Sequence, residues 1–488
     1  MPRVRTVALA ATIAGVVLAL LVVWAVGPWQ DGYRVAEHHG DRGTQSVAAE
    51  SGGATAAAPD ERRVTPPVLL PVDADPAGAA PTDAGVRAAL APLLDDPSLG
   101  DAVAVSVVDA VTGRPLYTAD ADRGAVPAST TKITTAVAAL SALPEDHRFT
   151  TSTVLSAAPD TVVLVGGGDP TLTALDGAQY AGQFAPARLD RLATSTAAAL
   201  KAAGRTSIRL TYDTSLFTGP VNHPISPNVN IAPVVPLMTD EGRVDATKTG
   251  VPSERLTDPA GGAATQFAQM LAKEGIAVNG KPTAGTAPPA AAQLAAVQSP
   301  PIPEYVERMM TASDNDMAEA LLRHIAIARG KPASFVGGAQ AVHEVLAGLG
   351  VKLGATDLKD GSGLDRLNKL PPAVLTQLVT LASSPAHPEL RPTLTGMPIA
   401  GFTGTLSDRF DAQASLAAAG IVRAKTGSLT GVSTLAGLVR DSDGRLLAFA
   451  FLADDVPGAA DLARPALDRM AAALAGCGCG TPVAQAAG

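Results

Sequence analysis

Cysteine, aromatic residues and blocks of positive charge are all scarce in this sequence. Its 488 residues include only Cys477 and Cys479, too few for a disulfide framework or a four-ligand zinc site. Aromatic residues make up 3% of the chain, so aliphatic side chains must fill its core. The chain has 37 Lys and Arg residues and 46 Asp and Glu residues, which gives a net charge of −9. Because the sequence also has no block of basic residues, nucleic acid is not expected as a partner.

Metal-binding patterns are also missing. The 7 histidines are scattered and form no His-Glu-x-x-His motif. We therefore expect neither a metal nor an organic cofactor. The two cysteines could close a small disulfide in an oxidising compartment or belong to an inert tail, and the sequence leaves both readings open.

A long apolar run is present only at the N-terminus. Residues 7–26 carry no charge, follow Arg3 and Arg5, and end at Gly27-Pro28. A helix of about twenty residues spans the ~30 Å hydrocarbon core of a membrane, whereas the apolar part of a signal peptide is usually about 7–15 residues. An uncleaved anchor is favoured over a cleaved signal peptide. Both place the bulk of the chain outside the cytoplasm.

The rest of the chain divides by composition. Residues 28–85 are rich in Gly, Ala, Pro and acidic residues without a period, which predicts a disordered linker. Segments 86–150 and 301–480 are expected to form one domain, interrupted by a smaller α/β domain at 151–300. Residues 481–488 are a tail.

Strand and helix patterns from both ends of the chain predict an antiparallel sheet with helical cover. The strands alternate with turn signals such as Asp441-Ser442-Asp443-Gly444. The expected elements of this domain are a hairpin over 103–118, strands at 421–428, 432–439 and 446–452, and helices at 129–143 and 459–474. The insert is expected to hold strands at 161–165 and 207–212 and helices at 187–203 and 262–274, with a Pro- and Ala-rich exit at 280–300.

Ser129 and Lys132 form the first motif that suits nucleophilic catalysis. They stand three residues apart at the start of a predicted helix, on one face and about one turn apart. A serine hydroxyl needs a base to become a nucleophile, and a desolvated lysine can be neutral and act as that base. Taken alone, the pattern is more often a helix cap with a solvated lysine.

The second and third motifs are Ser313-Asp314-Asn315 and Lys425-Thr426-Gly427. The second lies on a turn between predicted helices, where its hydroxyl and amide can both point into a cleft. The third lies in a predicted strand, where glycine indicates close approach of a ligand and the lysine and threonine suit an anionic group. Alone, these would be read as a helix cap and an exposed edge strand.

Each of these two motifs has a second copy. Ser226-Pro227-Asn228 and Lys248-Thr249-Gly250 stand about twenty residues apart, in Pro- and Asn-rich chain without a strand or helix pattern. Because the chemistry needs a helix turn and a strand, we reject this second pair.

Together and in this order, the three motifs resemble the signature of the penicillin-recognising serine acyltransferases. Gly-Gly-Gly-Asp-Pro-Thr-Leu at 166–172, Asp-Gly-Ser-Gly-Leu at 360–364 and Gly-Thr-Leu at 404–406 are similar to the D-alanyl-D-alanine carboxypeptidase/endopeptidase branch, the penicillin-binding protein 4 type. The resemblance covers about residues 86–476. It implies a β-lactamase/DD-peptidase-like α/β (α+β) fold, with an antiparallel sheet, flanking helices and an inserted domain. We interpret Asp169 and Ser362 within these segments as structural turn residues.

The resemblance implies three catalytic residues. Ser129 would attack the carbonyl between two D-alanines and become acylated, Lys132 would accept its proton, and Ser313 would relay a proton to the leaving amine. The backbone N–H groups of Ser129 and Ser428 would form the oxyanion hole, where losing one donor typically costs ~10²–10³ in rate.

The resemblance also implies a set of substrate-binding residues. Asn315 would hold the substrate amide and Lys425 would supply a positive field. Thr426 and Ser428, which flank Gly427, would hold the terminal carboxylate.

The implied activity is that of a serine D-Ala-D-Ala carboxypeptidase, with carboxypeptidase and endopeptidase action left open. Its partners would be peptidoglycan stem peptides ending in D-Ala-D-Ala, with β-lactams as covalent inhibitors. A serine β-lactamase-like hydrolase is one alternative, but no Glu-x-x-x-Asn element lies between Ser313 and Lys425. A non-catalytic cell-wall-binding homologue is another, and the intact motifs argue against it.

Overall fold

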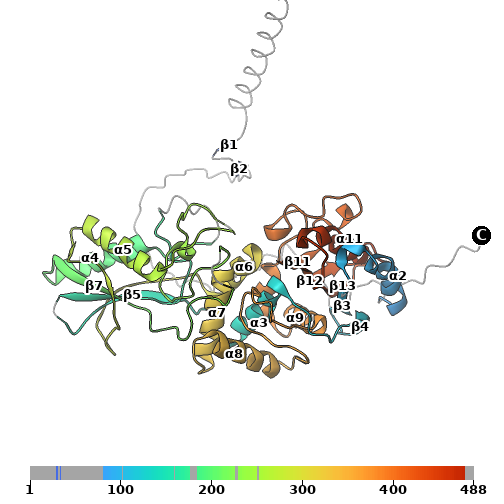
Figure 1. Cartoon of the computed structure of the whole chain (residues 1–488), viewed down its shortest axis with the longest axis horizontal. Helices are drawn as coiled ribbons and strands as arrows, with labels where there is room; N and C mark the ends of the chain where they lie inside the picture. Colours follow the sequence, from blue (N-terminus) through green and yellow to red (C-terminus); the bar gives the residue numbers. More distant parts are fainter. Residues whose placement is uncertain are drawn as a thin grey trace, which may run out of the picture. The chain divides into compact units, whose positions relative to one another are not determined.

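A computed structural model describes residues 81–478, except 102, 159, 176–183, 226–228 and 250–251, together with the short strands β1 (Trp29–Gln30) and β2 (Tyr33–Arg34) (Figure 1). The chain forms two compact units, Met1–Pro71 and Val72–Gly488.

In the first unit, β1 pairs antiparallel with β2 inside the segment predicted to be a linker. The predicted membrane anchor at 7–26 lies outside the described residues. Among the residues that are described, no helix is long and apolar enough to cross a membrane. The anchor stays a prediction.

The second unit contains a five-stranded antiparallel sheet built from both ends of the chain, as the strand patterns predicted. The strand order is β11-β12-β13-β3-β4, so the C-terminal strand β13 pairs with the N-terminal strand β3. The strands are β3 (Val103–Asp109), β4 (Pro115–Ala119), β11 (Arg423–Leu429), β12 (Val432–Arg440) and β13 (Leu446–Ala453).

Helices cover both faces of this sheet because its central strands are apolar on both sides. On β13, Ala448 and Ala450 face one core, while Phe449 and Phe451 face another. The first core is filled by α3 (Lys132–Ala142), α6 (Ile302–Ala312), α7 (Asn315–Ala328), α8 (Phe335–Gly348), α9 (Pro372–Ser383) and the short α10 (Pro392–Thr395). The second is filled by α2 (Asp83–Leu94) and α11 (Arg464–Ala475).

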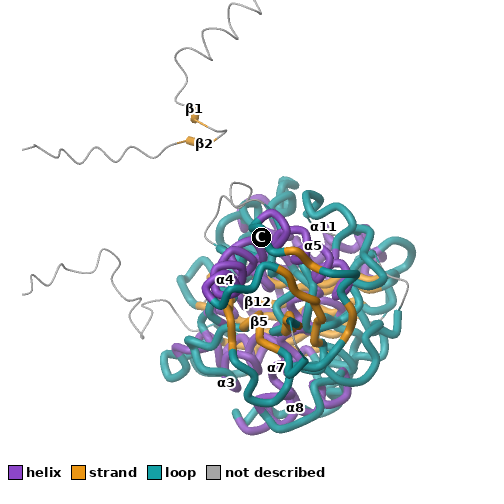
Figure 2. Tube along the Cα trace, turned by 90° about the vertical axis from the view of Figure 1, so that its left-hand side faces the viewer, coloured by secondary structure: helices purple, strands orange, loops and turns teal. Residues whose placement is uncertain are grey.

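A second, mixed sheet lies in the inserted segment, with its own apolar core against α4 (Leu189–Ala202) and α5 (Pro259–Lys273). Its order is β10-β5-β6-β7-β8, with β9 also paired to β7. The strands are β5 (Thr150–Leu155), β6 (Thr161–Val165), β7 (Ser207–Asp213), β8 (Ala277–Val278), β9 (Thr283–Ala284) and β10 (Gln293–Gln298). In Figure 2, β5 and β12 are seen near the middle of the view, with α11 toward the top and α8 toward the bottom.

One strand was not expected, and two expected helix starts were wrong. The exit segment 280–300 contains β10, which pairs with β5 although only Ala295 along it is buried, so ladder hydrogen bonds rather than apolar alternation define it. The final helix begins at Arg464, because residues 460–463 form a 3₁₀ turn and Pro465 occupies the first helical turn. The helix expected from Ser129 begins at Lys132, after a 3₁₀ turn.

Candidate active site

Ser129 sits in the 3₁₀ turn Ala128–Thr131 that precedes α3. Ala128 has a φ of +46°, a left-handed conformation that non-glycine residues seldom adopt and that often marks functional sites. Gly363 packs so closely here that a Cβ on it would lie 1.8 Å from the Ala128 carbonyl oxygen. The contact with Gly363 therefore holds this turn in its conformation. Ser129 itself is half-buried.

Lys132 lies one turn further on and is fully buried. Its Nζ donates to Ser129 Oγ at 3.1 Å, to Asn315 Oδ1 at 2.6 Å and to the Ser362 carbonyl at 2.7 Å. Burial lowers the pKa of this ammonium to about 8, because desolvation disfavours its charged form. Lys132 can therefore lose its proton near neutral pH and act as a base.

The second motif forms the turn between α6 and α7. Ser313 has a φ of +57° and ends α6, and the Asp314 side chain caps α7 by accepting from Met317 N–H. This turn directs Ser313 Oγ toward Lys425 Nζ, at 2.8 Å. The Asn315 Nδ2 group donates to the Asn230 carbonyl at 2.9 Å, so the amide is held at both ends.

The third motif lies on β11, the edge strand of the five-stranded sheet. Lys425 is fully buried, and the pKa of its ammonium lies well below the usual value because of burial and the nearby Lys132 charge. At Gly427 a Cβ would lie 3.0 Å from Ser129 N and 2.2 Å from Thr434 Oγ1. Glycine thus lets the strand approach the Ser129 turn, while Ser428 at the next position is exposed.

The structure therefore brings the predicted site residues together at one place. Lys132 connects Ser129 with Asn315, and Lys425 reaches Ser313 from the facing strand. The rejected copies do not take part: the side chain of Lys248 is 77% exposed, and 226–228 and Gly250 lie outside the described residues.

The sequence matches the model of the D-Ala-D-Ala carboxypeptidase 3 (S13) family over residues 86–254 and 246–474. The chain belongs to this family. Its D-Ala-D-Ala carboxypeptidase type, inferred from the three motifs, is thereby confirmed.

Curated relatives are similar along most of the chain. A carboxypeptidase of Mycobacterium tuberculosis is 39% identical over 88% of this chain and 92% of its own length. Carboxypeptidase DacB of Mycolicibacterium smegmatis is 38% identical over 86% of this chain and 92% of its own. The crystal structure of penicillin-binding protein 4 from Haemophilus influenzae shares the fold, with a TM-score of 0.64 and 24% identity over 79% of this chain and 97% of that one.

Sequence reasoning missed three partners of the S13 motif residues. The Ser362 carbonyl accepts from Lys132, the Asn230 carbonyl accepts from Asn315, and the Thr405 hydroxyl lies 2.7 Å from that of Thr426. The segments 360–364 and 404–406 carried a signal, since both stood out in the sequence. The Asn230 contact carried none.

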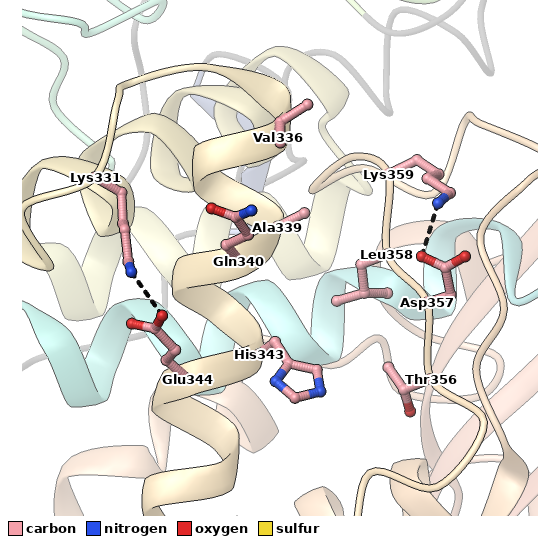
Figure 3. A pocket seen from close by; sticks show the side chains of 10 residues that line it. All are labelled: Lys331, Val336, Ala339, Gln340, His343, Glu344, Thr356, Asp357, Leu358 and Lys359. Atoms are coloured by element: carbon pink, nitrogen blue, oxygen red, sulfur yellow. Dashed lines mark hydrogen bonds and ion pairs between the residues drawn. The ribbon is translucent and has the colours of Figure 1, made fainter.

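A pocket of about 580 Å³ lies between α8 and residues 356–359 (Figure 3), and no predicted site residue lines it. Its charged side chains are paired locally, Lys331 with Glu344 and Lys359 with Asp357, each at 2.7 Å. The pocket is separate from the Ser129 site.

Two buried clusters contain side chains of the kinds that bind metal ions, but in each cluster a carboxylate already pairs with a basic side chain. Arg255 pairs with Asp316 in the group Glu241, Asp314 and Asp316, and Arg243 pairs with Glu241. In the group His223, Glu319 and Asp360, the imidazole lies 2.9 Å from Asp360. Cys477 is disulfide-bonded, and Cys479, the other cysteine of the sequence, lies outside the described residues.

Proposed function

We propose that this D-Ala-D-Ala carboxypeptidase trims peptidoglycan stem peptides through an acyl-enzyme on Ser129. The observation that carries the proposal is the 3.1 Å contact between Lys132 Nζ and Ser129 Oγ, inside a site where that lysine is fully buried. A buried amine with a pKa of about 8 can be neutral and can accept the serine proton.

In acylation, Ser129 Oγ forms a bond to the carbonyl carbon between the two D-alanines while its proton passes to Lys132. The oxyanion is stabilised by the backbone N–H groups of Ser129 and Ser428, as an edge strand has N–H groups free of strand partners on one side. When the intermediate collapses, the C–N bond breaks and the leaving amine takes a proton through Ser313. Water then hydrolyses the ester and restores Ser129.

Substrate binding would use the facing strand. The Lys425 charge and the Thr426 and Ser428 hydroxyls would hold the terminal carboxylate, and backbone beside Gly427 would contact the peptide. Asn315 would hold the substrate amide with its second Nδ2 hydrogen, since its first is directed at Asn230.

β-Lactams would acylate the same serine. A solved structure of Haemophilus influenzae penicillin-binding protein 4, 25% identical with a TM-score of 0.62, is described as complexed with a β-lactam. The ring amide supplies the carbonyl that Ser129 attacks, and its amine stays attached to the acyl group instead of leaving. We expect a slowly hydrolysed adduct rather than β-lactamase turnover.

The test is covalent labelling with a fluorescent penicillin. The wild type should label and Ser129→Ala should not, while Ser141→Ala on α3 serves as the matched control and should label normally. Equal labelling of wild type and Ser129→Ala would overturn the nucleophile assignment. Release of D-alanine from a pentapeptide, compared with cleavage of a cross-linked dimer, separates carboxypeptidase from endopeptidase action.

We also propose that the enzyme works outside the cytoplasm, held to the membrane by residues 7–26. Support comes from the uncharged run behind Arg3 and Arg5. Deleting residues 1–27 should leave penicillin labelling intact but move the protein from the membrane fraction to the soluble one. Unchanged membrane association would contradict the anchor.

A further inference from the structure

A buried layer of charged side chains lies directly behind Lys132. Its link to the lysine is the backbone of Ser362, whose carbonyl accepts from Lys132 Nζ at 2.7 Å and whose N–H donates to Glu319 Oε1 at 2.9 Å. Gly361 N–H donates to the same Glu319 oxygen at 3.0 Å, and Thr135 on α3 donates to the Gly361 carbonyl at 2.7 Å. The loop that touches Lys132 is thus fixed by a carboxylate.

Asp360 begins this loop and is only 1% exposed. Both of its carboxylate oxygens accept hydrogen bonds from the surrounding protein. Its Oδ2 lies 2.9 Å from His223 Nε2, and a carboxylate that accepts several hydrogen bonds is stabilised in its ionised form. The remaining donors are Gly363 N, Asp365 N, Asn368 Nδ2 and Ser362 Oγ. These bonds keep the pKa of Asp360 below its usual value despite burial.

His223 enters this layer from the inserted segment. Its ring is buried edge-on against Phe335, with centroids 5.4 Å apart, and it faces the carboxylates of Asp360, Glu319 and Asp365. These negative charges outweigh the cost of burial and raise the pKa of His223. The raised pKa favours the protonated form of this ring, and in that form it offsets part of the negative charge next to Lys132.

We propose that Glu319, Asp360 and His223 form a charge cluster that sets the protonation of Lys132 and hence the pH range in which Ser129 is acylated. All three are positioning residues that act through Lys132. The proposal rests on the proposed function of Ser129 and Lys132, and it gives the 360–364 segment a role beyond a structural turn.

Several other charges face the same lysine. Asp314 and Asp316, from the α6–α7 turn and from α7, favour its ammonium form, as do Asp360 and Glu319. Lys425 faces it from β11 with the opposite effect. Further charged neighbours of these groups are Arg323, next to Glu319, and Glu241, Arg243 and Arg255, next to Asp314 and Asp316.

Among the three cluster residues, Glu319 offers the cleanest substitution. Its Oε1 accepts both loop N–H groups, whereas its Oε2 has no hydrogen-bond partner within the described part of the chain. Burial raises the pKa of Glu319, and Glu319→Gln can keep the acceptor while removing the charge of the ionised form. Asp360→Asn is less suitable, because an NH₂ group would then face backbone donors.

The measurement is the second-order rate of acylation by a fluorescent penicillin between pH 5 and 10. The wild-type rate should rise with pH through about 8, as Lys132 loses its proton. Removing a nearby negative charge makes that proton easier to lose, so Glu319→Gln should move the midpoint down by about one pH unit. At one unit below the wild-type midpoint this is about a fivefold gain in rate.

His223→Gln removes the basic partner of Asp360 and the positive charge that the protonated ring contributes, so it should move the midpoint up. The matched control is His387→Gln, because His387 also pairs with a carboxylate, Glu389 at 3.0 Å, but in an exposed position. The control should keep the wild-type profile. Opposite shifts cannot come from a general loss of stability, which would lower the plateau and leave the midpoint in place.

The outcomes distinguish a failure of the proposed function from a failure of the charge cluster. If the wild type is not acylated at any pH, the proposed function fails. If it is acylated but Glu319→Gln and His223→Gln shift the midpoint in the same direction or not at all, the charge cluster is overturned while the function stands. Circular dichroism melts of each variant show that the compared proteins are folded.

Discussion

Lys425 and Lys248 each begin a Lys-Thr-Gly tripeptide, and their side chains lie in opposite environments. Lys425 is fully buried and donates to Ser313 Oγ at 2.8 Å, whereas the Lys248 side chain is 77% exposed and lies 3.4 Å from Asp245. Burial and the nearby Lys132 charge lower the pKa of Lys425, and in its charged form this side chain would act at short range in a medium that screens poorly. The same three letters suit the proposed chemistry only where the fold removes water from them.

The difference arises from the neighbouring strand. Residues of β11 pair one by one with β12, from Arg423 opposite Leu438 to Leu429 opposite Val432, and this register fixes on which face of the sheet each side chain of the edge strand lies. Lys248 follows a turn in which Thr247 is hydrogen-bonded to Asp245, with no strand to hold it.

The largest expected contrast comes from removing each lysine. Lys425→Ala should lower the rate of penicillin acylation by about 10²–10³-fold, because the site loses a buried cation that stabilises charge in the transition state. Lys248→Ala should change it less than about twofold. The rate is measured by quenching the reaction with fluorescent penicillin at successive times and quantifying the labelled protein. A comparable loss in both variants would show that burial does not distinguish the two copies.

The glycine of the buried copy gives the next contrast. Gly427→Ala would place a methyl group 2.2 Å from Thr434 Oγ1 and 2.8 Å from the Pro127 carbonyl, so β11 must move away from the Ser129 turn. Because a displacement of about 1 Å in an active site can cost about 10²-fold, we expect a loss of about 10–10² in acylation rate.

Gly348→Ala is the matched control for that change. Gly348 lies in the last turn of α8, and apart from the backbone of that helix no atom lies within 4 Å of the place that a Cβ would occupy. Alanine should therefore be accepted or slightly stabilising, by about 0.5 kcal/mol. Acylation should not change. If Gly427→Ala were as active as this control, the close approach of β11 to Ser129 would be contradicted.

Strand patterns were enough to predict the five-stranded sheet, and the motifs named residues that the fold brings together, because both features depend on side-chain identity. The strands at both ends of the chain are long and apolar, so β3 and β11–β13 were expected close to their observed bounds. β10 was missed because its sequence has little alternation, and its pairing with β5 depends on backbone groups that every residue carries.

The missed site contacts have the same cause. Lys132 and Ser362 are 230 positions apart, Asn315 and Asn230 are 85 apart, and in both pairs the acceptor is a backbone carbonyl. Every residue has a backbone carbonyl, so the residue type does not indicate which carbonyl accepts such a hydrogen bond. The domain boundaries also stay predictions, because the structure does not divide its second unit any further.

A smaller contrast concerns the threonines. Thr405 Oγ1 lies 2.7 Å from Thr426 Oγ1, so it can donate to Thr426 and leave the Thr426 hydroxyl free to donate to a substrate carboxylate. Thr405→Val removes this bond, worth about 1 kcal/mol, and should raise KM for a D-Ala-D-Ala peptide about fivefold with little change in kcat. Thr405→Ser should restore KM. A fall in kcat alone would contradict a role in carboxylate binding.

The smallest expected effect lies at the exposed copy itself. The pKa of Asp245 is lowered first by the Thr247 hydroxyl and only afterwards by Lys248, so the turn and not the ion pair holds this carboxylate. A lowered pKa contributes stability above the pKa of the unfolded chain and loses it as the pH falls, but full exposure to water makes that contribution slight. Lys248→Ala should therefore melt at the wild-type temperature in both low and high salt. A salt-dependent drop in the melting temperature would show that Lys248 has a structural partner stronger than Asp245, and would narrow the contrast with the buried Lys425.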